Sequence, residues 1–303
     1  VWLLGSICSA TAAGFYVQVS HQLGADDGPQ ARDTLRQGIV SVLAVSMVLS
    51  LTALAVSPFL PVWLGGNADI NASASAYFAI IAMGIPAFQF SIFGSGMLRS
   101  SGNMVIPSIM SVVMMSLDVV FNFFLIFPTR TVSILGTAFT MPGAGLSVEG
   151  AAIGTVSAEC IAASITMYLL CFRRGELSLR RRPGRFRPTR RVLGKALHIS
   201  LPMGLQQGIM CSAYVATTLI IAPLGTFAIA ANSFGIIIES LCYMPGYGIA
   251  DAATTLVGQS LGAARHELMK RFAWLSVLLG MAVMAVMGVV MYVGAPFAMS
   301  LMT

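Results

Sequence analysis

Long apolar runs alternate with short polar segments along the chain, and the polar segments are rich in Gly, Pro, Asn or charged residues. A helix needs about 20 apolar residues to cross the hydrocarbon core of a bilayer. Eight runs reach that length, at 1–23, 36–62, 73–98, 104–127, 149–172, 196–222, 228–258 and 270–296. The pattern predicts an all-α membrane protein, a polytopic helical bundle with about eight transmembrane helices in this chain.

Composition supports a membrane protein and excludes several functional classes. Hydrophobic residues make up 57% of the chain and charged residues 9%, whereas soluble domains have about 25% charged residues. The five cysteines lie in apolar runs without metal-ligand spacing, so we expect them to be packing residues. The sequence shows no nucleotide-binding Gly-rich loop and no catalytic constellation. We therefore expect no enzyme activity, no cofactor and no metal beyond a possible sodium ion.

The basic residues predict how the spans are oriented. If the segment after the first span is cytoplasmic, 16 of the 17 Lys and Arg lie on the cytoplasmic side and only Arg130 lies outside. This is the bias found in multi-pass proteins of the inner (plasma) membrane. The run at 173–191 could be taken for a nucleic-acid patch, but the positive-inside bias explains it better. We expect no nucleic-acid partner and a lipid bilayer around the spans.

An internal repeat divides the chain. VSHQLGA at 19–25 matches VGQSLGA at 257–263 at an offset of 238 residues. Repeated membrane halves are typical of alternating-access transporters. We expect 1–172 to hold spans two to six of an amino-terminal lobe, 173–195 to be a basic cytoplasmic linker, and 196–303 to hold spans seven to nine. The complete protein would then have two repeated lobes of six helices and roughly 450 residues.

One apolar run, 104–127, carries a carboxylate near its middle. Inserting an unpaired carboxylate at the middle of a span costs about 2.5–3.5 kcal/mol. Asp118 therefore indicates either a functional role or a buried polar contact between helices. Asn122 lies four residues on and shares its helix face. This face predicts either a polar helix–helix contact inside the bundle or a functional site that offers a carboxylate and a carboxamide.

Several motifs together resemble the multidrug and toxic compound extrusion (MATE) family. They are VSHQLGAD, VGQSLGAA, MLRSSGNMVIPSI, LDVVFNFFLIF, GLSVEGAAIGTVSAE and LPMGLQQG, and the resemblance covers nearly the whole chain. It implies two six-helix lobes around a central cavity. It also implies a secondary active antiporter that exports drugs, organic cations or toxic metabolites in exchange for protons or sodium.

The resemblance also implies where the coupling ion binds. The family builds an amino-terminal cation site from an Asp on the first span, two polar residues one turn apart on the fifth, and a Thr on the sixth. The last three correspond here to Asp118, Asn122 and Thr155, and the first-span Asp is not in this sequence. Relatives often have Asn first and Asp second on the fifth span, so the charge here is displaced by about 5.4 Å. Glu159 lies one turn after Thr155 and joins the candidate site, unless it is a neutral acid bonded to a neighbouring helix.

A second polar set lies in the carboxy-terminal part. Its members are Glu239, Asp251, Gln206 and Gln207, which either form a second-lobe site or bond between helices. No Lys or Arg lies in a span core, which favours small amphipathic or cationic substrates. The alternative is a flippase for lipid-linked saccharides, although such proteins tend to place basic residues in the cavity. We expect a monomer.

Overall fold

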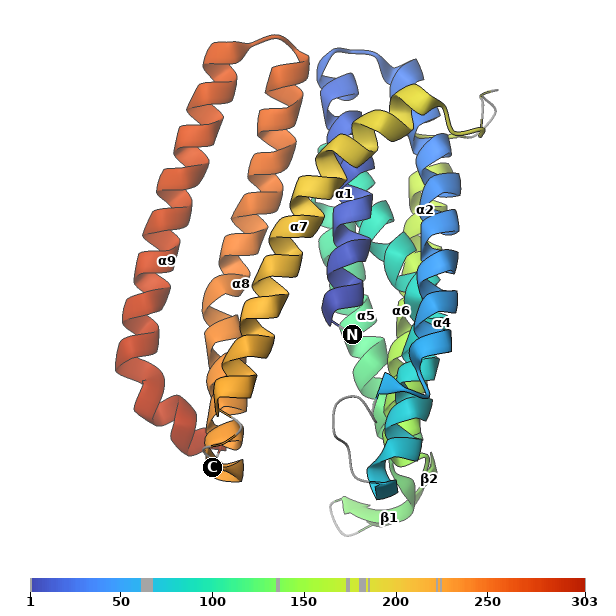
Figure 1. The fold of residues 1–303 in the computed structure, drawn as a ribbon, viewed down its shortest axis with the longest axis vertical. Coiled ribbons are helices and arrows are strands. Elements are labelled where there is room, and N and C mark those ends of the chain that lie inside the picture. The colour runs from blue at the N-terminus through green and yellow to red at the C-terminus, as the bar shows by residue number, and fades with distance from the viewer. Residues whose placement is uncertain are drawn as a thin grey trace. The chain divides into compact units, whose positions relative to one another are not determined.

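The computed structural model describes residues 2–60, 68–134, 137–172, 175–179, 184, 186–221, 223 and 225–302. Within these ranges the chain forms eight long helices (Figure 1). They are α1 (Trp2–Gly24), α2 (Gly28–Val56), α4 (Ala68–Ser100), α5 (Val105–Ile126), α6 (Ser147–Phe172), α7 (Arg190–Ile221), α8 (Thr226–Gly262) and α9 (His266–Met302). Each predicted run corresponds to one helix, which confirms the all-α class. Among the described residues, α2, α4, α5, α6 and α9 are long and apolar enough to cross a membrane.

The helices extend beyond several of the predicted spans. α2 begins at Gly28 rather than at 36, and α7 begins at Arg190 rather than at 196. Hydropathy marks where the hydrocarbon core begins, whereas a helix continues through polar residues until a turn ends it. Residues 61, 62 and 222 of the predicted spans lie outside the described residues.

The chain divides into two compact units. Unit 1 comprises Val1–Val19 and Gly28–Gly204, and unit 2 comprises Ser20–Asp27 and Leu205–Thr303. These units are defined by contacts within this chain. The predicted lobes at 1–172 and 196–303 refer to the complete protein, and their boundaries stay a prediction.

Small residues hold the helices of unit 1 close together. Cys8, Ala53, Ala82 and Ile85 form a buried cluster of α1, α2 and α4, and Ser50 Oγ of α2 donates to the Ala82 carbonyl at 2.8 Å. Membrane helices associate through such close contacts because lipid provides no hydrophobic driving force between them. Cys8 thus packs as expected.

Glycines bring α4 and α6 into the same close contact. A Cβ added at Gly84 would lie 2.6 Å from Val156 Cγ2, and one at Gly94 would lie 3.0 Å from Thr166 Cγ2. Side chains larger than hydrogen would push the two backbones apart. α4 therefore holds α6 along much of its length.

An antiparallel hairpin joins α5 to α6, where the hydropathy pattern predicts no element. Strands β1 (Pro128–Ile134) and β2 (Thr137–Ala144) pair with Thr131 opposite Thr140, and the register shifts between Pro128 and Arg130. At its base, Leu146 N donates to the Leu125 carbonyl at 3.0 Å. The hairpin therefore brings the end of α5 back against the start of α6.

The basic linker packs on α2 in unit 1. Gln37 Oε1 accepts hydrogen bonds from the backbone N and the hydroxyl of Thr189, both at 2.9 Å. Arg32 Nη1 donates to the Glu176 carbonyl at 3.0 Å. Residues 173, 174, 180–183 and 185 of the linker lie outside the described residues.

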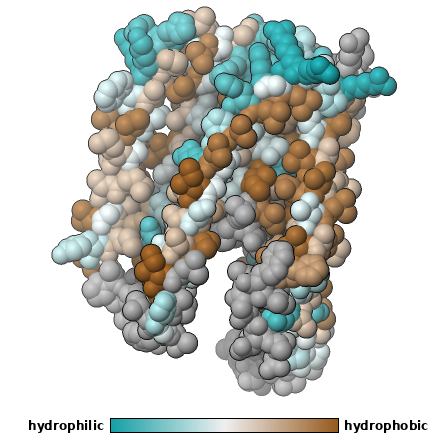
Figure 2. Space-filling view, viewed as in Figure 1, coloured by the Kyte–Doolittle hydropathy of each residue, from teal (hydrophilic) through white to brown (hydrophobic). Residues whose placement is uncertain are grey.

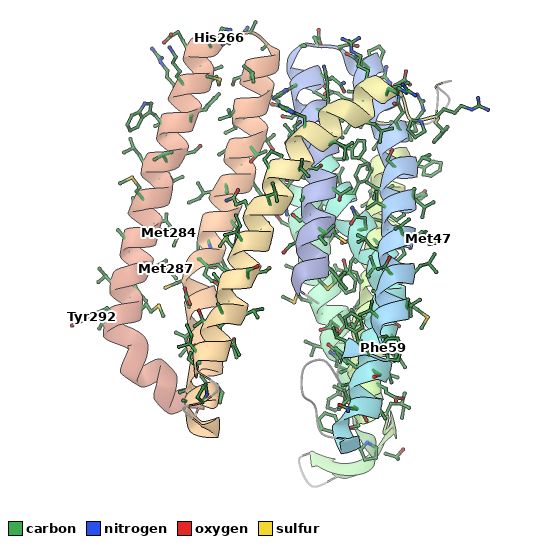
Figure 3. All side chains as sticks on the ribbon, in the orientation of Figure 1. Met47, Phe59, His266, Met284, Met287 and Tyr292 are labelled. Carbon is green, nitrogen blue, oxygen red and sulfur yellow. The ribbon has the colours of Figure 1, made fainter. Side chains whose placement is uncertain are left out.

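In unit 2, α8 and α9 form an antiparallel pair. A Cβ added at Gly246 would lie 3.2 Å from Met284 Sδ, and Cys242 Sγ lies 3.3 Å from the Met287 carbonyl. Tyr292, 87% exposed, points away from α8 (Figure 3). The Met284 side chain thus fills the space beside Gly246.

Large apolar side chains cover the outer helix faces. Met47, Leu51, Val112 and Val119 are all more than half exposed. In each unit brown apolar residues run along the helices, whereas teal polar residues gather at helix ends (Figure 2). An apolar face of this extent fits contact with lipid rather than with water.

The repeated turns have the same backbone geometry. After α1, Asp26 N donates to Leu23 O and Asp27 N to Gln22 O, and Asp26 has φ 58°. After α8 the corresponding bonds recur at the offset of 238, and Ala264, the counterpart of Asp26, has φ 56°. Both ends are Schellman motifs with a left-handed residue. The matched sequence segments at 19–25 and 257–263 therefore end their helices with the same backbone turn.

Replacing Ala264 by Gly is expected to raise the Tm of the purified protein. Ala is strained at positive φ, and relief of that strain should stabilise the fold by roughly 1 kcal/mol. Thermal denaturation in detergent measures the change. Asp26→Gly is the matched control and should gain less, because Asp tolerates this conformation better. A lower Tm for Ala264→Gly would contradict the strain argument.

Candidate functional site

Asp118 and Asn122 lie one turn apart on α5, as predicted, and Asn122 packs against α6. A Cβ added at Gly154 of α6 would overlap Asn122 Oδ1 and would lie 3.3 Å from Asn122 Cγ. Gly150, one turn earlier, packs in the same way on the Leu125 backbone. The Asn122 amide therefore lies on the α6 backbone immediately before Thr155.

Glu159 joins three helices at one polar cluster. Its side chain is only 4% exposed. The Ser91 hydroxyl of α4 hydrogen-bonds to it, and it interacts electrostatically with Asp118 of α5. We call Asp118, Asn122, Thr155, Glu159 and Ser91 the inner polar cluster.

Two acceptors of the inner polar cluster are unsatisfied. Asp118 Oδ1 and Asn122 Oδ1 are both buried and have no hydrogen-bond partner. Such a buried acceptor costs about 1–3 kcal/mol. The described ion pairs, Arg36–Asp33 and Lys270–Glu267, do not involve the Asp118 carboxylate. These two oxygens could therefore accept a hydrogen bond or bind a cation.

The structure brings together most of the first predicted set. Asn122 and Gly154 are in contact, and Asp118 and Glu159 interact. Thr155 is half-buried next to Gly154 and one turn from Glu159, on the same helix face. Carboxylate, amide and hydroxyl oxygens are ligands that suit a proton or a hard cation. The described residues contain no group of three or more His, Cys, Asp or Glu that could hold a metal ion.

Sequence reasoning missed Ser91. Ser is common in membrane helices, and a single sequence gives no indication of which residue faces it across a helix interface. The contact follows from the close packing of α4 on α6, which the glycines permit.

The second predicted set is spread out. Glu239 is exposed and Asp251 half-buried on α8, about 18 Å apart at 1.5 Å per residue. Thr255 Oγ1 donates to the Asp251 carbonyl at 3.2 Å. Gln206 is exposed and Gln207 half-buried on α7. Glu239 and Asp251 are too far apart to share one ion, and a role for each of these four residues stays a prediction.

Several relatives of similar sequence are named as probable multidrug resistance proteins. The chain is 25% identical over 266 residues to a "Probable multidrug resistance protein NorM" of Thermotoga maritima, covering 88% of this chain and 54% of the relative. A protein of the same name from Idiomarina loihiensis is 27% identical over 289 residues, covering 94% and 59%. The chain therefore spans a little over half the length of these relatives.

Solved structures share the fold. A structure described as MATE in the straight conformation has a TM-score of 0.84 at 21% identity, covering 100% of this chain and 64% of that chain. A MOP superfamily transporter from Pyrococcus furiosus has a TM-score of 0.86 at 20% identity, covering 99% and 63%. At this identity the likeness establishes the fold alone. A sequence profile of the MatE family matches residues 1–124 and 202–303. Because these matches cover most of the chain, the protein belongs to the MatE family.

Proposed function

We propose that the complete protein is a secondary active antiporter of the inner (plasma) membrane. It exports small amphipathic or cationic compounds in exchange for protons or sodium. Family membership and the names of the relatives support export of such compounds. The spans carry no Lys or Arg between their ends, which favours cationic or neutral substrates over the pyrophosphate of a lipid-linked saccharide.

The inner polar cluster is the proposed coupling site. The observation that carries this proposal is the pair of buried, unpartnered oxygens, Asp118 Oδ1 and Asn122 Oδ1, close to the buried Glu159. A proton or a sodium ion bound there would supply the missing partner and reduce the negative charge of two interacting carboxylates.

Binding at this position would act on helix packing. Ser91, Asp118 and Glu159 come from α4, α5 and α6, so the charge of one cluster affects three interfaces. An ion shifts a conformational equilibrium only when it binds the two states with different affinity. Repacking of α5 on α6 as the cluster gains and loses its cation would give that difference, and would couple the ion gradient to the accessibility of the substrate site.

Efflux by the full-length protein is expected to stop when its ion gradient is removed. Proteoliposomes or cells loaded with ethidium should export the dye under an inward proton or sodium gradient, and collapsing the gradient should remove export. Each gradient is imposed separately, which identifies the coupling ion. Efflux that continues unchanged without either gradient would refute the antiporter.

A further inference from the structure

The two repeated turns contact each other within unit 2 (Figure 1). The last turn of α1 carries Ser20 and Gly24, and the end of α8 carries Gly258 and Gly262 at the same spacing. A Cβ added at Gly258 would lie 2.6 Å from Ser20 Oγ. Small residues four positions apart let two helix backbones approach closely, and both elements use this pattern.

The contact is reciprocal. A Cβ added at Gly24 would overlap the carbonyl oxygen of Gln259 and lie 2.7 Å from the Gln259 Cα. A Cβ added at Gly262 would overlap the carbonyl oxygen of His21 and lie 2.8 Å from the His21 carbonyl carbon. At the offset of 238, Gly24 corresponds to Gly262 and His21 corresponds to Gln259. Each turn therefore offers its glycine to the backbone of the other at equivalent positions.

A buried hydrogen bond adds to the close packing. Ser20 Oγ donates to the Thr255 carbonyl at 3.1 Å, and these residues are 1% and 5% exposed. The contacts described between the two turns are thus backbone approach at glycines and a neutral hydrogen bond. Such an interface brings the two backbones into close contact when it is closed.

We propose that this contact, the repeat clasp (residues 20–24 with 255–262), is a reversible closure of the transport pathway on the cytoplasmic side. The charge bias places both turns on that side. A transporter with two repeats must alternate between states that are open to opposite sides. The clasp holds one state closed and separates in the other. This inference rests on the proposed transport function.

Thiol labelling tests the closure without any substrate. The full-length protein, freed of other cysteines, carries Thr255→Cys as a reporter, which the clasp buries. Adding Gly24→Ala or Gly262→Ala should speed maleimide labelling by about tenfold or more, because the added methyl cannot fit in the closed clasp. Gly280→Ala, where a Cβ would meet nothing within 4 Å, is the matched control and should leave labelling unchanged.

A second reporter separates opening from unfolding. The same Gly variants in a protein that retains only native Cys8, 1% exposed in the α1–α2–α4 cluster, should leave Cys8 protected. Fast labelling at 255 with Cys8 protected supports the proposal. If both glycine variants label at residue 255 no faster than the parent protein, the proposed closure is wrong.

Cross-linking tests whether transport requires the repeat clasp to open. It also tests the proposal if a glycine variant unfolds. A Cβ at Gly258 would lie 3.1 Å from Ser20 Cβ, and disulfides need a Cβ separation of about 3.5–4.5 Å. A small outward shift of the two turns therefore lets the cysteine-free full-length variant Ser20→Cys/Gly258→Cys form a disulfide. The reduced protein should export ethidium, oxidation should abolish export, and reduction should restore it. Full export by the cross-linked protein would overturn the closure. A parent protein that never exports would count against the proposed function instead, and the labelling result would still decide whether the clasp opens.

Discussion

Replacing Asp118 by Asn in the full-length protein should abolish gradient-driven efflux while leaving the protein folded and inserted. Asn is nearly isosteric with Asp but neutral, so it imitates the cation-bound state permanently. The cluster then loses the charge change that would bias α5 and α6 between two packings. Ethidium efflux under imposed proton and sodium gradients measures the loss, and size-exclusion profiles with Tm values check the fold.

Two sets of variants control this result. Glu149→Gln removes a carboxylate from the exposed first turn of α6 and should transport normally. Asn122→Ala and Thr155→Ala should weaken the ion dependence more mildly, because each removes a neutral oxygen. Normal transport by Asp118→Asn, with unchanged pH and sodium dependence, would make Asp118 a packing residue and leave Glu159 or Glu239 to be tested for coupling.

Adding one methyl group at Gly154 should cost the protein stability and impair efflux. The new Cβ would overlap Asn122 Oδ1, and overpacking of this kind costs about 1–3 kcal/mol. Gly154→Ala should therefore lower the Tm in detergent and displace the amide from the inner polar cluster. Gly288→Ala, with nothing within 4 Å of an added Cβ, is the control for the substitution itself.

A double-mutant cycle identifies the cause. In an Asn122→Ala background the side chain that Gly154→Ala would strike is absent, so most of the Tm loss should disappear. The non-additive part measures the contact. If Gly154→Ala costs as much stability in the Asn122→Ala background as in the parent protein, the Asn122–Gly154 contact is not what limits the size of residue 154.

The helices were predictable because their signal is local. A run such as 104–127 needs only its own residues to indicate a spanning helix, and α5 at Val105–Ile126 agrees closely. The one-turn spacing of Asp118 and Asn122 followed equally from helical periodicity. The resemblance, not periodicity, connected Thr155 to them.

The rest depends on contacts between distant residues. Ser91 meets Glu159 across two helices, and no pattern within α4 distinguishes it from other serines. The hairpin β1–β2 was missed because its strands follow a long apolar run, where β-branched residues such as Val132 and Ile134 add little contrast. The sequence repeat indicated that the turns at 19–25 and 257–263 are related, but only the structure shows that they touch.

The reciprocal contact of the repeat clasp has approximate two-fold symmetry. A surface that presents residue 24 to the counterpart of residue 21, and the reverse, is self-complementary, which is the condition for an isologous two-fold interface. A protein with a single lobe and one such turn would dock by the same surface onto a second copy of itself. Within one chain, Gly24 and Gly262 therefore occupy equivalent positions on the two sides of a pseudo-two-fold contact.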